Sequence, residues 1–591
     1  MASIGYRYIK RKIDMQRNSL IYWGLVFIGI GLFLQCQYSY LFFYQEQLQL
    51  FQLTRQYVWD TVLVPGGLVD YLAGFFQQFY AVPFFGALFT SLLLVSIGYI
   101  GKKVLCELSG KNLLWVDSLA LIPIIGLVFL HTNLYYHLSG SIACLMCFSG
   151  WLIYLKNIHR SNRWLLGIFL LSLVYLLAGP VYSLFIAGLV VCEWKLHRTH
   201  VIGTIASFLI AGGVWIILSL GMNWAVGGRQ IIKPDFYCEF LPEVQKVYYV
   251  WGSCLLSILL GCWLSEKRIP QLWSMMFSLF LLLGGLYGVY HTQDRMQLYS
   301  YERDWYLRNQ QWNKIITTFN EERASDLTMN VLNLALACQG ELGNKMFSFP
   351  QSGSKSLLSE WDNSLMSAMI YSDICYQVGD IASSQKFAFE GYVTSTKGNV
   401  RLMQRLVETN IIEGNYRVAE KYIALLENTL FYKNWAEKQR QFLGDSLIAA
   451  NEEYIAKRLS LRGHGLYAVS SNFVHTLKLL VTNNPQNRMA FEYWIGFILL
   501  NKDLSAFKKL YDTYYHTDIW PELSLNEQQA VIALEQDSPG NWVKMGVSLA
   551  TEQAYGSFSQ DLADKRGYIN FVEEMKKAHG KTYWFYLLFK K

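Results

Sequence analysis

Charged residues are scarce in this 591-residue chain, where they make up 16% of the sequence against 53% hydrophobic residues. This composition is typical of membrane proteins and excludes an ordinary soluble globular chain. The sequence also lacks a phosphate-binding P-loop, a dinucleotide-binding glycine motif, a nucleophile-elbow serine and an HExxH zinc motif. These absences argue against a nucleotide-driven enzyme or pump.

Cysteine usage and net charge exclude two further classes. The ten cysteines are scattered, and most lie in apolar runs, where cysteine behaves as a small hydrophobe. Cys144 and Cys147 form a CxxC motif without a histidine or a second pair nearby, so no metal site is predicted. The formal net charge of +7 is explained by basic loops between membrane spans, and no nucleic-acid partner is expected.

Hydrophobic runs divide the chain into two parts. Runs of span length dominate up to about Tyr290, and the composition beyond Gln293 is that of a soluble protein. We therefore predict an all-α fold, with a polytopic membrane domain at residues 1–292 and a helical domain at 293–591. About nine spans are predicted, at Leu20–Phe43, Ala81–Ile100, Leu113–Leu130, Leu138–Leu155, Trp164–Leu177, Val181–Val191, Val201–Leu220, Val247–Leu264 and Leu272–Tyr290.

Basic residues predict how these spans are oriented. The N-terminus and every second loop are rich in Lys and Arg, whereas the long loop 44–80 contains only Arg55. Because basic loops stay in the cytoplasm, we expect a cytoplasmic N-terminus and an outward-facing loop 44–80. An odd number of spans places residues 293–591 outside as well. In a bacterium this describes an inner (cytoplasmic) membrane protein with a periplasmic C-terminal domain.

Residues 293–591 contain repeated helical hairpins. VGDIASSQKFAFEGY (Val378–Tyr392) and EGNYRVAEKYIALLE (Glu413–Glu427) each place a glycine at a turn between helices. The two glycines are 35 residues apart, close to the period of about 34 residues in tetratricopeptide repeats. Tyr306–Phe319 and Ile498–Tyr515 resemble degenerate copies. We predict an α-solenoid of the tetratricopeptide type, which either binds a partner or rigidifies the membrane domain.

Three segments that are predicted to face outward carry the candidate functional residues. The loop 44–80 supplies Glu46, Asp60 and Asp70, and HTNLYYH (His131–His137) supplies two histidines. The third segment, 221–246, supplies Arg229 and Lys233. Acids, imidazoles and cations on one side of a membrane are the groups needed to deprotonate a hydroxyl and to hold a lipid-linked phosphate.

Each candidate also has a structural interpretation. Glu46 follows the first span closely and is equally explained as an interfacial acid whose carboxylate reaches the water. Asp60 is expected to be structural, and Asp70 follows Gly66-Gly67, where a carboxylate suits the first turn of a helix. His131 and His137 are also explained as histidines that form hydrogen bonds at the membrane interface. Arg229 and Lys233 are also explained as ordinary cations of a loop.

The first hundred residues resemble the GT-C class of polyprenyl-phosphate-dependent glycosyltransferases. In that class an acidic motif, often DExxYxxxA, follows the first span, and a PPLxYWL-like stretch precedes the second. This chain reads QEQLQLFQLTRQ (Gln45–Gln56), VPGGLVDYLAGFF (Val64–Phe76) and FFGALFTSLLL (Phe84–Leu94) at the corresponding places. It departs from the pattern where Gln45-Glu46-Gln47 replaces the acidic pair and Gly-Gly replaces the second proline.

The resemblance implies a mechanism. Glu46 would be the general base of an inverting transfer from a polyprenyl-phosphate-linked sugar, with Asp70 and His137 as further catalytic groups. Arg229, Lys233, His131 and Tyr135 are the implied phosphate- or carrier-binding residues. The resemblance assigns no metal ion or other cofactor, and the repeats would bind a protein or glycan acceptor or a partner subunit.

Other readings stay open beside this one. A membrane core followed by repeats is also similar to the eukaryotic transmembrane-and-repeat O-mannosyltransferases. The whole chain, including NLALACQGELGNKMFSFPQSG (Asn333–Gly353), resembles an uncharacterised family of multi-pass membrane proteins typical of Bacteroidota. The main alternative is a non-catalytic scaffold subunit of an envelope complex. A transporter or flippase is disfavoured, because the spans show no internal duplication.

Overall fold

The computed structural model describes most of the chain as two compact units. We call them the membrane unit (Met1–Asp294) and the helical unit (Arg295–Lys591). The described residues contain only two strands, β1 (Ala225–Val226) and β2 (Arg229–Gln230), which confirms the all-α class. The described ranges are 2–110, 114–159, 162–196, 201–221, 225–226, 229–230, 233–238, 241–264, 270–461, 473–536 and 539–590.

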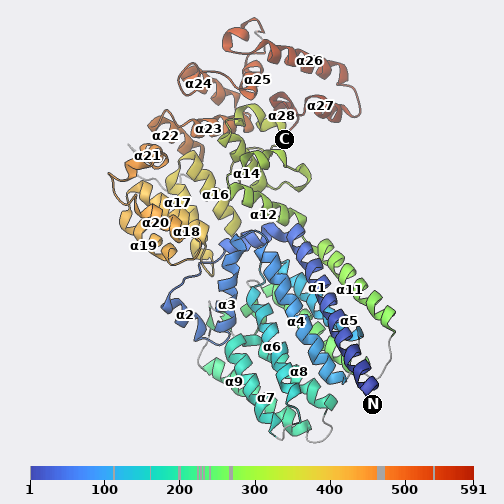
Figure 1. Cartoon of the computed structure of the whole chain (residues 1–591). Helices are drawn as coiled ribbons and strands as arrows, with labels where there is room; N and C mark the ends of the chain where they lie inside the picture. Colours follow the sequence, from blue (N-terminus) through green and yellow to red (C-terminus); the bar gives the residue numbers. More distant parts are fainter. Residues whose placement is uncertain are drawn as a thin grey trace. The chain divides into compact units, whose positions relative to one another are not determined.

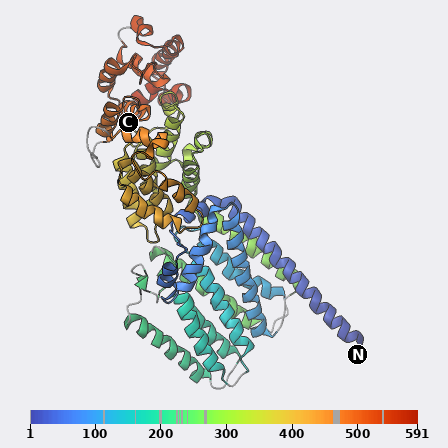
Figure 2. The same cartoon turned by 60° about the vertical axis from the view of Figure 1, so that its left-hand side comes forward.

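Long apolar helices make up most of the membrane unit, and they run side by side in Figures 1 and 2. Seven segments of the described chain are long and apolar enough to cross a membrane, so this is a membrane protein. The helices are α1 (Ala2–Gln47), α2 (Arg55–Val62), α3 (Gly67–Gln77), α4 (Phe85–Ser109), α5 (Leu114–His131), α6 (Leu138–Lys156), α7 (Arg163–Ala178), α8 (Tyr182–Leu196), α9 (Val201–Gly221), α10 (Leu241–Leu264) and α11 (Gln271–Thr292).

One of the seven segments, Arg163–Lys195, consists of two antiparallel helices. A short 3₁₀ turn at Gly179–Val181 separates α7 from α8. The Arg163 Nε atom at the start of α7 donates to Glu193 Oε1 near the end of α8, at 3.1 Å. The chain therefore reverses at Gly179, where the sequence predicts a break between two short spans. The total of nine spans stays a prediction.

A buried ion pair joins two helices of the membrane unit. Lys102 of α4 lies with its Nζ atom 2.8 Å from Asp117 Oδ1 of α5, and both residues are buried. The same Nζ atom donates to Ser19 Oγ at 2.5 Å, and Trp23 Nε1 donates to Asp117 Oδ1 at 2.9 Å. Pairing offsets the cost of removing charges from water, and these bonds join α1, α4 and α5.

The helical unit is built from shorter helices that follow one another along the chain (Figure 2). Most successive pairs between α16 and α20, and between α22 and α28, pack against each other. The helices are α12 (Arg295–Arg308), α13 (Trp312–Thr317), α14 (Asp326–Cys338), α15 (Leu342–Lys345), α16 (Leu365–Val378), α17 (Ile381–Thr394), α18 (Val400–Glu413), α19 (Tyr416–Glu427), α20 (Lys433–Arg440), α21 (Glu452–Leu459), α22 (Phe473–Asn483), α23 (Arg488–Leu500), α24 (Leu504–Tyr514), α25 (Leu525–Leu534), α26 (Leu549–Lys565), α27 (Phe571–His579) and α28 (Tyr583–Phe589).

Five turns in the described part of this unit end an α-helix in the same way. A residue with positive φ follows the helix: Gln310, Gly340, Gly379, Gly414 or Lys502. In each turn the residue after the positive-φ residue donates its backbone N–H to the carbonyl five positions earlier. This is the hydrogen bond of the Schellman motif. These bonds run from Gln311 to Tyr306, Glu341 to Leu336, Asp380 to Cys375, Asn415 to Asn410, and Asp503 to Ile498. The two degenerate copies, Tyr306–Phe319 and Ile498–Tyr515, thus form the same turn with Gln310 and Lys502 in place of glycine.

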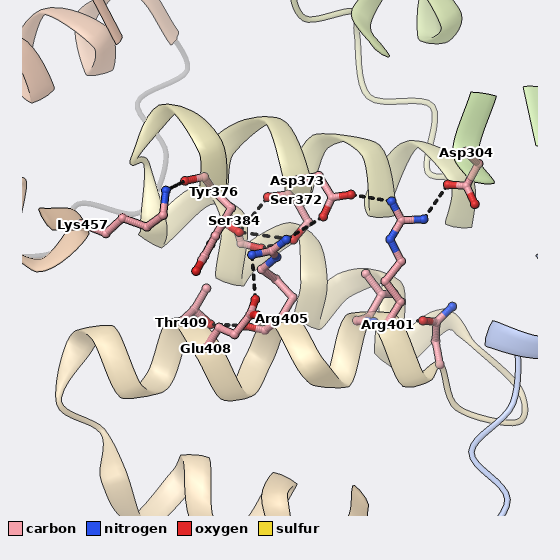
Figure 3. A network of polar contacts seen from close by, with 12 residues as sticks. Asp304, Ser372, Asp373, Tyr376, Ser384, Arg401, Arg405, Glu408, Thr409 and Lys457 are labelled. Carbon is pink, nitrogen blue, oxygen red and sulfur yellow. Dashed lines mark hydrogen bonds and ion pairs between the residues drawn. The ribbon is translucent and has the colours of Figure 1, made fainter. Parts of the chain in front are cut away.

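A network of ion pairs joins three helices of this unit (Figure 3). Asp373 of α16 accepts hydrogen bonds from Arg401 and from Arg405, both of α18, the latter at 2.8 Å. Arg401 also donates to Asp304 of α12 at 2.5 Å, and Arg405 donates to Glu408 at 2.7 Å. Burial alone would raise the pKa of Asp373, but the two guanidinium groups outweigh burial and hold that pKa below its ordinary value.

We expect Asp373→Ala to lower the free energy of unfolding by about 3–5 kcal/mol, because Arg401 and Arg405 lose a buried partner. Since the folded pKa of Asp373 is depressed, its contribution is present above the ordinary pKa and is lost as the pH falls through the folded value. Thermal unfolding of the full chain in detergent measures both effects. Glu341→Ala, which removes an exposed carboxylate paired with Lys345, is the control and should change little.

Candidate functional site

The first membrane helix ends in three buried polar residues. Gln45, Glu46 and Gln47 are 8%, 3% and 1% exposed, and they form the last turn of α1. The carbonyl of Gln45 accepts from the Gln77 side chain of α3 at 2.7 Å, which satisfies one of the carbonyl groups that a helix end leaves open. A carboxylate is unusual at this place, because the C-terminus of a helix carries partial negative charge.

The segment after α1 packs on α3 through amide and aromatic side chains. Gln49 is buried and donates to the carbonyl of Gly74 at 2.9 Å. The ring of Phe51 lies 5.0 Å from that of Tyr57 and 5.1 Å from that of Tyr71, measured between centroids. A Cβ atom on Gly74 would lie 2.9 Å from the Phe51 ring, so glycine allows this close approach. These contacts position α3 beside the end of α1.

Two glycines fix the start of α3, where the sequence predicts a helix beginning near Asp70. Gly66 has a φ of 82°, and its N–H donates to the carbonyl of Leu176 in α7 at 2.9 Å. Asp70 lies half-buried in the first turn of α3. Burial raises the pKa of Tyr57 to about 12, and the Asp70 carboxylate contributes to that rise. Asp60 is exposed at the far end of α2.

The turn between α5 and α6 meets the end of α1. Gln45 Nε2 donates to the carbonyl of Leu134 at 3.5 Å, within the predicted HTNLYYH segment. His131 is 4% exposed, and its Nε2 atom lies 2.7 Å from Ser141 Oγ of α6. His137 is half-buried at the first position before α6, and Tyr135 is half-buried within the turn. The His131 side chain is therefore hydrogen-bonded inside the protein, whereas Tyr135 and His137 are more exposed than His131.

The third predicted segment joins the same region. The backbone N–H of His137 donates to the carbonyl of Tyr237 at 2.9 Å. The Tyr237 hydroxyl donates to the carbonyl of Ala178 at the end of α7 and accepts from the N–H of Val181 at 3.3 Å. Lys233, four residues before Tyr237 in the same segment, is exposed. Arg229 lies in β2, and its side chain lies outside the described part of the structure.

The structure thus joins the segments that carry the predicted residues. The end of α1, the start of α3, the α5–α6 turn and residues 233–238 contact one another directly or through the α7–α8 turn. Sequence reasoning assigned no role to three glutamines that hold these segments together: Gln45, Gln49 and Gln77. Glutamines within an apolar sequence were the available signal, since a buried amide requires a hydrogen-bond partner.

Metal-ligating side chains do not cluster in the described part of the chain: no group of three His, Cys, Asp or Glu residues lies close enough to hold an ion. Cys144 and Cys147 are buried within α6. The polar side chains of the described residues around α1 and α3 are carboxylates, imidazoles, amides and phenols.

The α2–α3 turn should tolerate no side chain at Gly67, because a Cβ atom there would lie 1.8 Å from the carbonyl oxygen of Thr61. We expect Gly67→Ala to lower the free energy of unfolding by about 1–3 kcal/mol, since the backbone must shift. Unfolding of the purified protein in mild detergent measures the change. Gly252→Ala in α10 is the matched control, because its Cβ atom would meet nothing within 4 Å.

The fold and this site define a polytopic helical membrane protein that carries a second, helical unit. The chain belongs to the family of unknown function DUF6057, whose model matches residues 15–590. No curated protein and no solved structure matches the chain.

Proposed function

We propose that this protein is a membrane glycosyltransferase of the GT-C type, which transfers a sugar or glycan from a polyprenyl-phosphate carrier to an acceptor on the outer side of the membrane. The observation that carries the proposal is the position of Glu46. It is a 3% exposed carboxylate at the last turn of the first membrane helix, in a region to which three polar loops contribute. Buried ionisable groups at such places are commonly functional.

In the proposed reaction Glu46 is the general base. It takes the proton of an acceptor hydroxyl as the oxygen attacks the anomeric carbon of the sugar, and the bond to the carrier phosphate breaks with inversion. A positioned carboxylate provides a rate gain of about 10²–10⁴-fold in such proton transfers. The leaving phosphate requires cations, and the proposal assigns this role to Lys233, which is exposed, and to Arg229, which the sequence predicts for it.

The remaining predicted residues have supporting roles in this proposal. Asp70 and His137, which are both half-buried, are polar groups that could orient the acceptor. Tyr135 is a candidate contact for the carrier. His131 would act through Ser141 and the α5–α6 turn, since its Nε2 atom is already bonded there. The helical unit, as an α-solenoid of the tetratricopeptide type, would bind the acceptor or a partner subunit.

Replacement of Glu46 tests the proposal directly. Glu46→Gln keeps the shape of the side chain and removes the base, so we expect transfer of lipid-linked sugar in membranes to fall by at least about 10²-fold. The measurement is the rate of transfer from a radiolabelled polyprenyl-phosphate sugar pool into membrane or periplasmic acceptors. Asp60→Asn is the control, because Asp60 is an exposed carboxylate of the same loop and should leave the rate unchanged.

A transfer rate that survives Glu46→Gln intact would remove Glu46 as the base. A second function is favoured in that case by one observation: half of the chain forms the helical unit, which is built from repeated helix–turn–helix pairs. We infer a scaffold subunit of an envelope complex as this alternative. Purification in mild detergent separates the two, since a carrier lipid identified by mass favours the transferase and co-purified envelope subunits favour the scaffold.

The proposed orientation has its own test. The positive-inside rule predicts a cytoplasmic N-terminus and a periplasmic helical unit. An alkaline phosphatase reporter fused after Lys591 should therefore be active, because that enzyme matures only outside the cytoplasm. A fluorescent protein that folds only in the cytoplasm, fused at the same place, should be dark. The opposite pair of results would contradict a site and a helical unit on the outer face.

A further inference from the structure

Helix α2 presents large apolar side chains to the outside of the protein. It lies beside α3, at the end of the membrane unit where α1 ends, and none of its residues is buried. One side packs on the protein through Tyr57, whose ring contacts that of Phe51. Trp59, Leu63 and, just before the helix, Leu53 are 59%, 72% and 49% exposed. Large apolar side chains exposed together mark a surface that contacts something outside the chain.

The exposed side of α2 consists of two rows of side chains. Residues four positions apart lie on one row of a helix, so Arg55, Trp59 and Leu63 form one row. Gln56 and Asp60 form the neighbouring row, and all five residues are exposed. The first row is apolar apart from the cation at its end, and the second row is polar. This division is typical of a helix that lies flat in the interface of a bilayer.

The apolar row adjoins the lipid-facing surface of α7. Phe169, Leu173 and Leu176 are exposed along α7, within a segment that is apolar enough to cross a membrane. The N–H of Gly66 donates to the carbonyl of Leu176 at 2.9 Å. Leu63 lies three residues before Gly66, and three residues span at most about 11 Å. The lipid that surrounds the end of α7 is therefore within reach of the exposed row of α2.

The turn before α4 exposes another aromatic ring at the same end of the bundle. Phe84 is 67% exposed and has a φ of 68°, which a bulky residue adopts only where its surroundings impose it. The next residue, Phe85, packs inward, with its ring centroid 5.1 Å from that of Phe79. Phe84 lies four residues before Leu88, an exposed residue of the membrane-spanning helix α4. The strained turn thus places Phe84 at the outer limit of a lipid-facing row.

We propose that α2 and the turn before α4 anchor the loop 48–84 in the headgroup region of the bilayer. Trp59, Leu63 and Phe84 lie at the boundary with the acyl chains, and Asp60 faces water. Arg55, the only basic residue of the loop 44–80, lies against the lipid phosphates and is complementary to them in charge.

A bilayer fits these surfaces better than a partner protein does. The two anchors belong to separate segments, and each continues a lipid-facing surface of a membrane span. A bilayer covers both without a matching shape, whereas one partner would have to recognise both. The anchors lie before and after α3 in the chain, so they fix the depth at which the polar region around α3 meets the lipid. This anchoring is independent of the proposed transfer reaction.

Spin labels on the full chain in proteoliposomes test the proposal. The three cysteines that are not buried are first replaced by serine: Cys36, Cys106 and Cys338. Nitroxides are then attached at Trp59→Cys and Phe84→Cys, with Asp60→Cys as the reference for water and Leu88→Cys as the reference for lipid. We expect oxygen to reach the first two labels more readily than the label at Asp60. A water-soluble nickel chelate should reach them at least about threefold less.

Two outcomes overturn the proposal. Equal access of the nickel chelate to the labels at Trp59 and Asp60 places α2 in water. A label at Trp59 that neither oxygen nor the chelate reaches assigns the apolar row to a partner protein instead of a bilayer. Thermal unfolding of each labelled variant shows that the fold is intact.

Hydrogen exchange gives a second measurement, on the full chain in lipid nanodiscs with its cysteines in place. A helix of eight residues is barely stable alone, so the protection of its amides depends on what covers it. Trp59→Ser with Leu63→Ser should speed exchange of the α2 amides at least about fivefold, because contact with lipid is lost. Gln56→Ser with Asp60→Ser brings the same residue type to the polar row and should change exchange little. Equal acceleration by both pairs contradicts the anchoring.

Discussion

The membrane unit depends on one constraint: a polar group removed from water must find its partner within the protein. Its backbone meets this constraint by forming helices. Two cations and two carboxylates meet it by pairing with each other: Lys102 pairs with Asp117, and Arg163 pairs with Glu193. Both pairs join helices that follow one another along the chain, α4 with α5 and α7 with α8, and both lie toward the ends of the helices that are remote from Glu46. The polar groups around Glu46 are held differently, mainly by amides and backbone carbonyls.

This difference gives the two ends of the membrane unit distinct properties. Ion pairs bind helices strongly and leave little charge for a ligand. Amide contacts such as those of Gln45, Gln49 and Gln77 position the backbone without neutralising a nearby carboxylate. The α3 helix, the α5–α6 turn and the α7–α8 turn are connected through such bonds and through Tyr237. The arrangement is that of a preorganised polar region at the end of a packed helical bundle.

Much of the fold could be predicted from the sequence, because span length and helical repeats are local signals. Gly379 and Gly414 marked two turns correctly, since a positive φ favours glycine. Gln310 and Lys502 adopt the same turn with no such signal, because the hydrogen bond that closes the turn is independent of the side chain. For the site, the sequence located the polar segments. It could not show that His131 bonds to Ser141 or that Glu46 is buried, because both facts depend on packing between distant helices.

The reversal at Gly179 has a consequence for the surrounding lipid. The α7 helix has 16 residues and α8 has 15, so each spans only about 22–24 Å at 1.5 Å per residue. The hydrocarbon core of a bilayer is about 30 Å thick. Such hydrophobic mismatch is relieved when the bilayer thins locally, so the lipid headgroups on this flank should lie deeper than elsewhere around the protein. The α7–α8 turn adjoins Tyr237 and the start of α3. A thinned bilayer at this place would bring phosphate groups of lipids toward the polar region without any movement of the protein.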